Sequence, residues 1–187
     1  GYNPGATEVW QEALRIPAVK VVERGKLRKD VWDLIFANIR LPIVQEDMRA
    51  EIGSCTVGER RLRALVEKYG LPSFEAHKQA LFESTKKLME AEIRQIPEGE
   101  YKGEAKVYFD GHHPGSVHTI RVTITVKGGK IRFDYSSTDA QTTGFVNGTY
   151  TSSAAATILT FLQMVNPNMP HNQGMVEPIE IVIPEGP

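Results

Sequence analysis

The sequence predicts an α+β fold, with an N-terminal helical arm followed by an antiparallel-rich sheet and a packed helix of small residues. The prediction rests on a change of period along the chain. Apolar residues recur at helical spacing through much of the first half, whereas beyond residue 99 they alternate with polar ones. We therefore expect a mainly helical segment over residues 1–98 and a mixed α/β segment over 99–187, both parts of one larger domain or subunit.

Start and stop signals place the elements of the helical segment. A short helix is expected over residues 7–14 with Thr7 as its N-cap, followed by a strand over 18–22. Asp30 is expected to cap a helix over 31–41. A second helix runs from residue 43 to a stop at Gly70, with a possible break at Gly53.

One more helix is expected over residues 73–96. The helical segment carries two apolar stripes. One runs from Leu62 to Tyr69 in the helix before Gly70, and the other runs from Leu81 to Ile96 in this last helix. Stripes at this spacing are typical of a core or an interface.

The mixed segment is expected to consist of strands joined by turns. Strands are expected over 103–109 and 118–126, and Gly128-Gly129 marks a tight hairpin turn. A polar loop over 136–150 leads into a helix over 151–165 that is apolar on most sides and therefore expected to be buried. A final strand is expected over 177–184.

Composition excludes several classes of function. The 187 residues carry a net charge of -1, whereas a nucleic-acid-binding protein needs a clustered basic surplus. The single cysteine, Cys55, rules out an internal disulfide or a multi-cysteine zinc site, and a small packed residue is its expected role. No apolar run is long enough to span a bilayer, so we expect no membrane partner and a cytoplasmic location.

Three of the five histidines lie in the stretch YFDGHHPGSVH, residues 108–118. If the turn folds back, His113 and His118 converge with Asp110, and such a set of side chains suits a metal ion. The spacing matches no established metal motif. The alternative is an exposed turn between two strands, near a subunit or domain boundary, that holds no metal.

Two polar loops contain the candidate catalytic residues. Asn147 lies in the loop before the helix of small residues, and His171 and Asn172 lie in the loop after it. Such side chains stabilise a developing oxyanion when they are held rigidly. The alternative is that they cap helices and form turns. No phosphate-binding glycine loop is present, so ATP binding by this chain alone is not expected.

Five stretches resemble successive blocks of the hydantoinase B family. They are ATEVWQEALRIPAVKV, DVWDLIFANIRLP, VGERRLRALVEKYG, FDYSSTDAQTTGFVNGTY and NPNMPHNQGMVEPIEIVIPEG. They occur in the family's order, and from the first to the last they span nearly all of the chain. The family includes the B-type subunits of ATP-dependent hydantoinases, the matching half of oxoprolinases, and large subunits of acetone and acetophenone carboxylases.

The resemblance implies that this chain is a central fragment of a longer subunit and is inactive alone. It implies a partner of the hydantoinase A type that binds ATP, a hetero-oligomer, and a small-molecule substrate that is a cyclic amide or a ketone. The ATP and divalent metal of the full complex are expected outside this chain.

Two further functions remain open. The chain could be a non-catalytic assembly module whose helical arm docks partner subunits through the two apolar stripes. It could also be an autonomous metallohydrolase that uses Asp110, His113 and His118.

Overall fold

The computed structural model describes residues 5–186, which form two compact units. Unit 1 comprises Glu8–Phe74, and unit 2 comprises residues 75–186 together with 5–7. The division falls inside α3 (Leu71–Ile93), because the C-terminal part of this helix packs into the core of unit 2. Helices and an antiparallel-rich sheet confirm the α+β prediction. Within the described residues, no helix combines the length and hydrophobicity that crossing a membrane requires.

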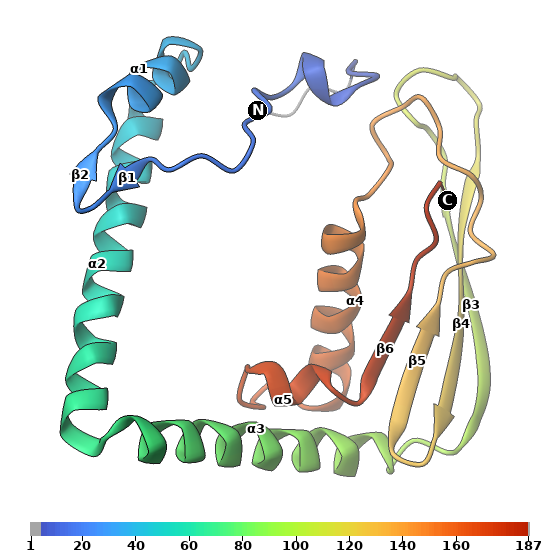
Figure 1. Ribbon diagram of the computed structural model, residues 1–187. Helices are drawn as coiled ribbons and strands as arrows, with labels where there is room; N and C mark the ends of the chain where they lie inside the picture. The colour runs from blue at the N-terminus through green and yellow to red at the C-terminus, as the bar shows by residue number, and fades with distance from the viewer. Residues whose placement is uncertain (1–4, 187) are drawn as a thin grey trace. The chain divides into compact units, whose positions relative to one another are not determined.

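Unit 1 contains two short strands and two helices (Figure 1). The 3-10 helix η1 spans Val9–Gln11, β1 spans Val22–Glu23, β2 spans Lys26–Leu27, α1 spans Lys29–Ala37 and α2 spans Ile43–Tyr69. The helix predicted over 7–14 was thus wrong, since only one 3-10 turn forms there. A short helix needs tertiary packing to be stable, and Trp10 and Leu14 are exposed. The strand predicted over 18–22 begins only at Val22.

The first full helix also differs from its prediction. Its N-cap is Arg28, and Asp30 lies in the first turn. The Arg28 guanidinium donates to the Asp30 carboxylate at 2.6 Å and lowers the pKa of Asp30 to about 2. The prediction that Asp30 is the N-cap was therefore wrong, and Asp30 instead forms an ion pair with Arg28 in the first turn of the helix.

The helix α2 is continuous through Gly53, so the possible break is absent. A glycine inside a helix costs about 1 kcal/mol, which its neighbours offset. The first part of α2 packs against the buried residues of α1 through Val44, Met48 and Ile52. No residue of α2 is buried, and Cys55, expected to be packed, is exposed.

Unit 2 is a four-stranded sheet with helices against it (Figure 1). Its strands are β3 (Gly99–Val107), β4 (His118–Lys127), β5 (Lys130–Asp134) and β6 (Ile179–Val182), in that spatial order. The first three are antiparallel, and β6 pairs parallel to β5 because the chain crosses over through α4 (Tyr150–Val165) and α5 (Gln173–Val176).

The hairpin between β4 and β5 confirms the predicted turn. Lys127 pairs with Lys130, and both intervening glycines, Gly128 and Gly129, have positive φ. A two-residue turn of this kind matches the twist of the flanking strands. The turn fixes the register, which places Val126 opposite Ile131 on the buried face of the sheet.

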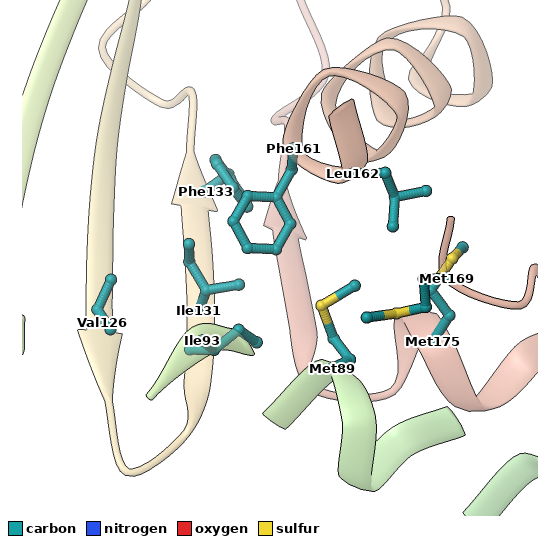
Figure 2. Close-up of a cluster of buried hydrophobic side chains, with 9 residues drawn as sticks. All are labelled: Met89, Ile93, Val126, Ile131, Phe133, Phe161, Leu162, Met169 and Met175. Atoms are coloured by element: carbon teal, nitrogen blue, oxygen red, sulfur yellow. The ribbon is translucent and has the colours of Figure 1, made fainter. Parts of the chain in front are cut away.

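The core of unit 2 lies between the sheet, α3 and α4 (Figure 2). Met89 and Ile93 of α3 are fully buried, and Phe133 of β5 meets Phe161 of α4 edge to face at 5.5 Å between ring centroids. The helix α4 is less buried than predicted, since Met164 remains 78% exposed. Part of the space beside α4 is therefore open.

Candidate functional site

The turn between β3 and β4 is organised around Asp110. Its carboxylate is fully buried, and Oδ1 accepts hydrogen bonds from the backbone N–H groups of His112 (2.9 Å) and His113 (2.8 Å). An aspartate at the start of a turn commonly bonds backbone groups just ahead of it. The local sequence thus folds this turn around its own carboxylate.

The second carboxylate oxygen joins the turn to a distant loop. Asp110 Oδ2 accepts a hydrogen bond from Thr142 Oγ1 at 2.6 Å and lies 2.6 Å from His113 Nδ1. His118 Nε2 lies 3.4 Å from the same oxygen without hydrogen-bond geometry, and this nitrogen is buried with no hydrogen-bond partner among the described residues. One carboxylate therefore holds two histidine rings and a threonine near one another.

These contacts keep Asp110 ionised. The Thr142 hydroxyl is the largest influence that holds the pKa of Asp110 well below its usual range. The His113 ring and the two backbone N–H groups act in the same direction, against the effect of burial, which would raise the pKa. The anion favours the tautomer of the exposed His113 ring that carries its proton on Nδ1.

The structure brings the three candidate metal ligands, Asp110, His113 and His118, to one place. Four donors already surround the two oxygens of Asp110, so the carboxylate has little capacity left for an ion. Across residues 5–186, no group of three or more His, Cys, Asp or Glu side chains is arranged to hold a metal. The donor set at Asp110 fits a structural clasp better than a divalent ion.

The loop between β5 and α4 is braced by Asn147. Its Oδ1 accepts a hydrogen bond from the Thr142 backbone N–H at 3.0 Å, and its Nδ2 donates to the carbonyls of Thr142 (2.6 Å) and Gly144 (2.9 Å). The side-chain amide is thus fully engaged within the loop. This bonding favours a role for Asn147 in holding the loop over a role as a direct oxyanion donor.

The loop and the turn approach each other closely at Gly144. A Cβ atom at this position would lie 1.9 Å from the backbone oxygen of Asp110, so no other residue fits without movement. The Phe145 N–H donates to that same oxygen at 3.0 Å. We call these contacts between Asp110, Thr142, Gly144 and Phe145 the Asp110 clasp.

A second carboxylate fixes the base of the loop to β4. Asp139 accepts hydrogen bonds from the Thr119 backbone N–H at 2.8 Å and from the Arg121 guanidinium at 2.5 Å. The Arg121 guanidinium, followed by the Thr119 N–H, lowers the pKa of Asp139. The loop is therefore anchored by ionised carboxylates at two of its residues, Asp139 and Thr142.

This anchored loop forms one rim of a cavity of about 750 Å³ between the sheet and α4. The sheet contributes an apolar wall that includes Val122, Ile124 and Phe133, and α4 contributes Ala156 and Thr160. Asn147 and His118 lie on its lining, whereas His113 does not. Small-molecule sites are concave and largely apolar with a few polar groups, and this cavity has that character.

His171 and Asn172 lie elsewhere, beyond the C-terminus of α4 (Figure 1). His171 is exposed. Asn172 caps α5 by accepting from the Gly174 N–H at 2.9 Å, and its Nδ2 donates to the buried Thr85 hydroxyl at 2.8 Å. The structure thus separates the loop of Asn172 from the loop of Asn147, and Asn172 joins α5 to α3.

Sequence reasoning missed the role of Thr142. Its partner Asp110 is 32 residues away, and a threonine in a polar loop is ordinary in composition. One sequence signal could have pointed to this contact. The turn rich in histidine precedes β4 and the loop rich in Thr, Gly and Asn follows β5, and the predicted hairpin of these two strands brings the turn and the loop to the same end of the sheet.

Comparisons with known proteins agree with this architecture. The family model described as hydantoinase B/oxoprolinase matches residues 1–187. The chain is 33% identical over 192 residues to a protein of Pseudomonas sp. strain NS671 that is named as the B component of a D-/L-hydantoinase, covering 97% of this chain and 32% of that protein. It is 32% identical over 182 residues to the beta component of caprolactamase from Pseudomonas jessenii, covering 97% and 31%.

Solved structures show the same fold. The crystal structure of the ATP-dependent caprolactamase from Pseudomonas jessenii superposes with a TM-score of 0.90 at 30% identity, over 98% of this chain and 31% of that one. A nucleotide-free acetone carboxylase superposes with a TM-score of 0.83 at 17% identity, over 97% and 26%, and supports the fold alone. The chain therefore spans about a third of the length of the hydantoinase and caprolactamase relatives and about a quarter of the acetone carboxylase chain. It belongs to the hydantoinase B/oxoprolinase family.

Proposed function

We propose that this chain is part of the B-type subunit of an ATP-dependent enzyme that hydrolyses a cyclic amide, with carboxylation of a ketone as the alternative reaction. The observation that carries the proposal is the family match over all 187 residues, together with the TM-score of 0.90 to an ATP-dependent caprolactamase. The sequence holds no phosphate-binding glycine loop, so we assign ATP to a partner of the hydantoinase A type. We also propose a cytoplasmic location, where ATP is available, and inactivity of this chain alone.

Within that enzyme, we assign unit 2 the task of shaping a rigid part of the substrate site. Stabilisation of an oxyanion in the hydrolysis of an activated amide requires groups that do not reorganise during the reaction. The Asp110 clasp and the Asn147 brace supply such rigidity to the cavity rim. Asn147 is therefore a positioning residue in this proposal.

The test uses the full-length subunit expressed with its hydantoinase A-type partner. ATP hydrolysis and ring opening are measured with caprolactam and hydantoin, and bicarbonate-dependent loss of acetone is measured in parallel. ATP consumption coupled to ring opening supports the proposal, and coupling to carboxylation alone replaces it with the ketone reaction. No ATP-dependent turnover with any of these compounds contradicts both.

Asn147→Ala tests the positioning role in the same assay. We expect a drop in kcat of about 10- to 100-fold with a smaller change in KM, because a misplaced rim weakens transition-state contacts more than binding. The matched control is Asn168→Ala. Asn168 is exposed, and the hydrogen bond it makes, to Asn166 Oδ1, comes from its backbone N–H and does not need its side chain. Equal activity of both variants sinks the role assigned to Asn147.

A second function, subunit docking, is favoured by the exposure of α2. This helix has 27 residues and none is buried, and its last turns expose Leu62, Leu65 and Tyr69 on one face. Such a helix gains stability chiefly when its apolar face packs against something. We infer that another part of the subunit or the A-type partner covers this face.

Co-purification tests the docking function. Leu62→Asp should reduce recovery of the tagged partner, whereas Ala64→Asp, about 200° away around the helix, should not. Unchanged recovery with Leu62→Asp argues that the partner docks elsewhere.

A further inference from the structure

We propose that the cavity between the sheet and α4 takes a neutral cyclic amide with an aliphatic body and excludes anionic cyclic amides. The inference rests on the proposed function and deepens it by naming the charge class of the substrate. Family membership alone does not decide this point, because the family description covers both hydantoinases and oxoprolinases. 5-Oxoproline, the oxoprolinase substrate, carries a carboxylate at neutral pH, whereas a simple lactam has no charge.

The wall of the cavity suits an aliphatic ring. Val122 and Ile124 of β4 and Phe133 of β5 line it from the sheet, and Phe161 and Met164 line it from α4. Its volume of about 750 Å³ lies in the usual range for small-molecule sites. A ring of methylene groups would replace water against these side chains at a gain of about 25 cal/mol per Å² of apolar area buried.

The charges around the cavity disfavour an anion. Among the described residues that line it, none is Lys or Arg, and the one aspartate among them, Asp139, has its carboxylate paired with Arg121. Arg121 alternates to the other face of β4, and its guanidinium is held by Asp139 at 2.5 Å and by the Ser137 carbonyl at 3.1 Å. A ligand carboxylate would lose water here without gaining a lysine or arginine partner.

Neutral polar groups in the lining suit an amide. Gln141 lies on the loop, and Ser153 and Thr160 lie on the face of α4 that lines the cavity. A hydroxyl both donates and accepts, so these side chains can pair with the carbonyl and the N–H of a ring amide. The lining thus offers a lactam an apolar wall and neutral hydrogen-bonding groups, and it offers a carboxylate no lysine or arginine.

Thiol labelling measures occupancy of the cavity independently of turnover. Ala156 lines the cavity, and Ala155 is exposed next to it on α4 but does not line the cavity. Each is replaced by cysteine in the full-length subunit, in complex with its partner and with Cys55→Ser removing the exposed native thiol. Modification by N-ethylmaleimide at each site is followed by peptide mass spectrometry.

We expect caprolactam, at ten times its half-protecting concentration, to slow modification of Ala156→Cys about tenfold. 5-Oxoproline at the same concentration should leave the rate unchanged, and neither compound should affect Ala155→Cys. Adding Thr160→Arg places a cation in the lining and should create protection by 5-oxoproline.

Four results would overturn the inference. Equal protection by both compounds, or no gain with Thr160→Arg, removes the electrostatic argument. A lack of protection by caprolactam removes the binding site. A site that is never modified without ligand shows that the rest of the subunit fills the cavity.

The two proposals fail separately. ATP-dependent ring opening without protection of Ala156→Cys keeps the proposed function and removes this inference. Protection without ATP-dependent turnover keeps the binding site and removes the proposed reaction.

Discussion

Gly144→Ala is the sharpest perturbation of the Asp110 clasp. A Cβ atom at position 144 would lie 1.9 Å from the Asp110 backbone oxygen and 2.7 Å from its Cβ. The obstacle is backbone, which has no rotamer to change. Because ordinary contact begins near 3.4 Å, the turn and the loop must separate by about 1.5 Å.

That separation breaks the shortest bonds between the two segments. The hydrogen bond from the Phe145 N–H to the Asp110 carbonyl contributes about 1 kcal/mol, and the bond from the Thr142 hydroxyl to the Asp110 carboxylate contributes about 1.5–3 kcal/mol because its acceptor is ionised. Together they predict a loss of about 2.5–4 kcal/mol in the free energy of unfolding of unit 2.

Hydrogen exchange of peptides from β4 and β5 measures this loss. A change of about 2.5–4 kcal/mol corresponds to about 60- to 800-fold faster exchange where exchange follows global opening of unit 2. Fluorescence provides an internal control, because Trp10 and Trp32 both belong to unit 1 and should report unchanged unfolding.

Gly103→Ala is the matched substitution in the same unit. Its added Cβ would lie 3.5 Å from Val122 Cγ1, an ordinary contact, and alanine replaces a glycine within a strand. We expect a stabilisation of about 0.5 kcal/mol. If Gly144→Ala changes exchange no more than Gly103→Ala does, the clasp does not hold the turn to the loop.

Three other variants probe the contacts around the site and the core. The pKa of Asp110 is lower in the folded chain than the value of about 3.9 in an unfolded one, so its contribution to stability is complete above about pH 4 and declines as the pH falls through the folded pKa. Asp110→Asn should therefore flatten the dependence of the unfolding free energy on pH below about pH 5. The unfolding free energy is measured by urea titration at several pH values, and an equal dependence on pH in the variant and the parent would contradict this. Ile93→Ala empties a fully buried position and should cost about 2–5 kcal/mol in urea unfolding, against less than about 1 kcal/mol for the half-exposed Ile120→Ala. Asn172→Ala removes a helix cap and the partner of Thr85, so we expect a loss of about 1–3 kcal/mol with no change in labelling of the cavity.

Features that depend on neighbouring residues were predictable from the sequence. The turn at Gly128-Gly129 is correct because only a few residues accept positive φ at two successive positions. The loop before α4 and the start of this helix are also correct, because Thr149 caps the helix through its own side chain.

Features that depend on tertiary contacts were not predictable in the same way. Residues 7–14 have helical spacing, yet only one turn forms because the apolar side chains find little to pack against. The clasp joins Asp110 to Thr142 across a hairpin, and no local pattern encodes that pair. Asp110, His113 and His118 do lie together as the sequence suggested. The contact that fixes Asp110, however, comes from Thr142, which has no distinctive spacing in the sequence.

The bonding of the polar residues indicates how this chain contributes to chemistry. The carboxylates of Asp110 and Asp139 and the amide of Asn147 are each engaged by donors or acceptors of the turn, the loop or β4. Groups so fully paired are expensive to release during a reaction, because each lost partner leaves a polar atom unsatisfied. They are therefore suited to fixing the shape of the cavity rim. In the proposed enzyme, activation by ATP is left to the partner, and the reacting groups are left to the rest of the B-type subunit.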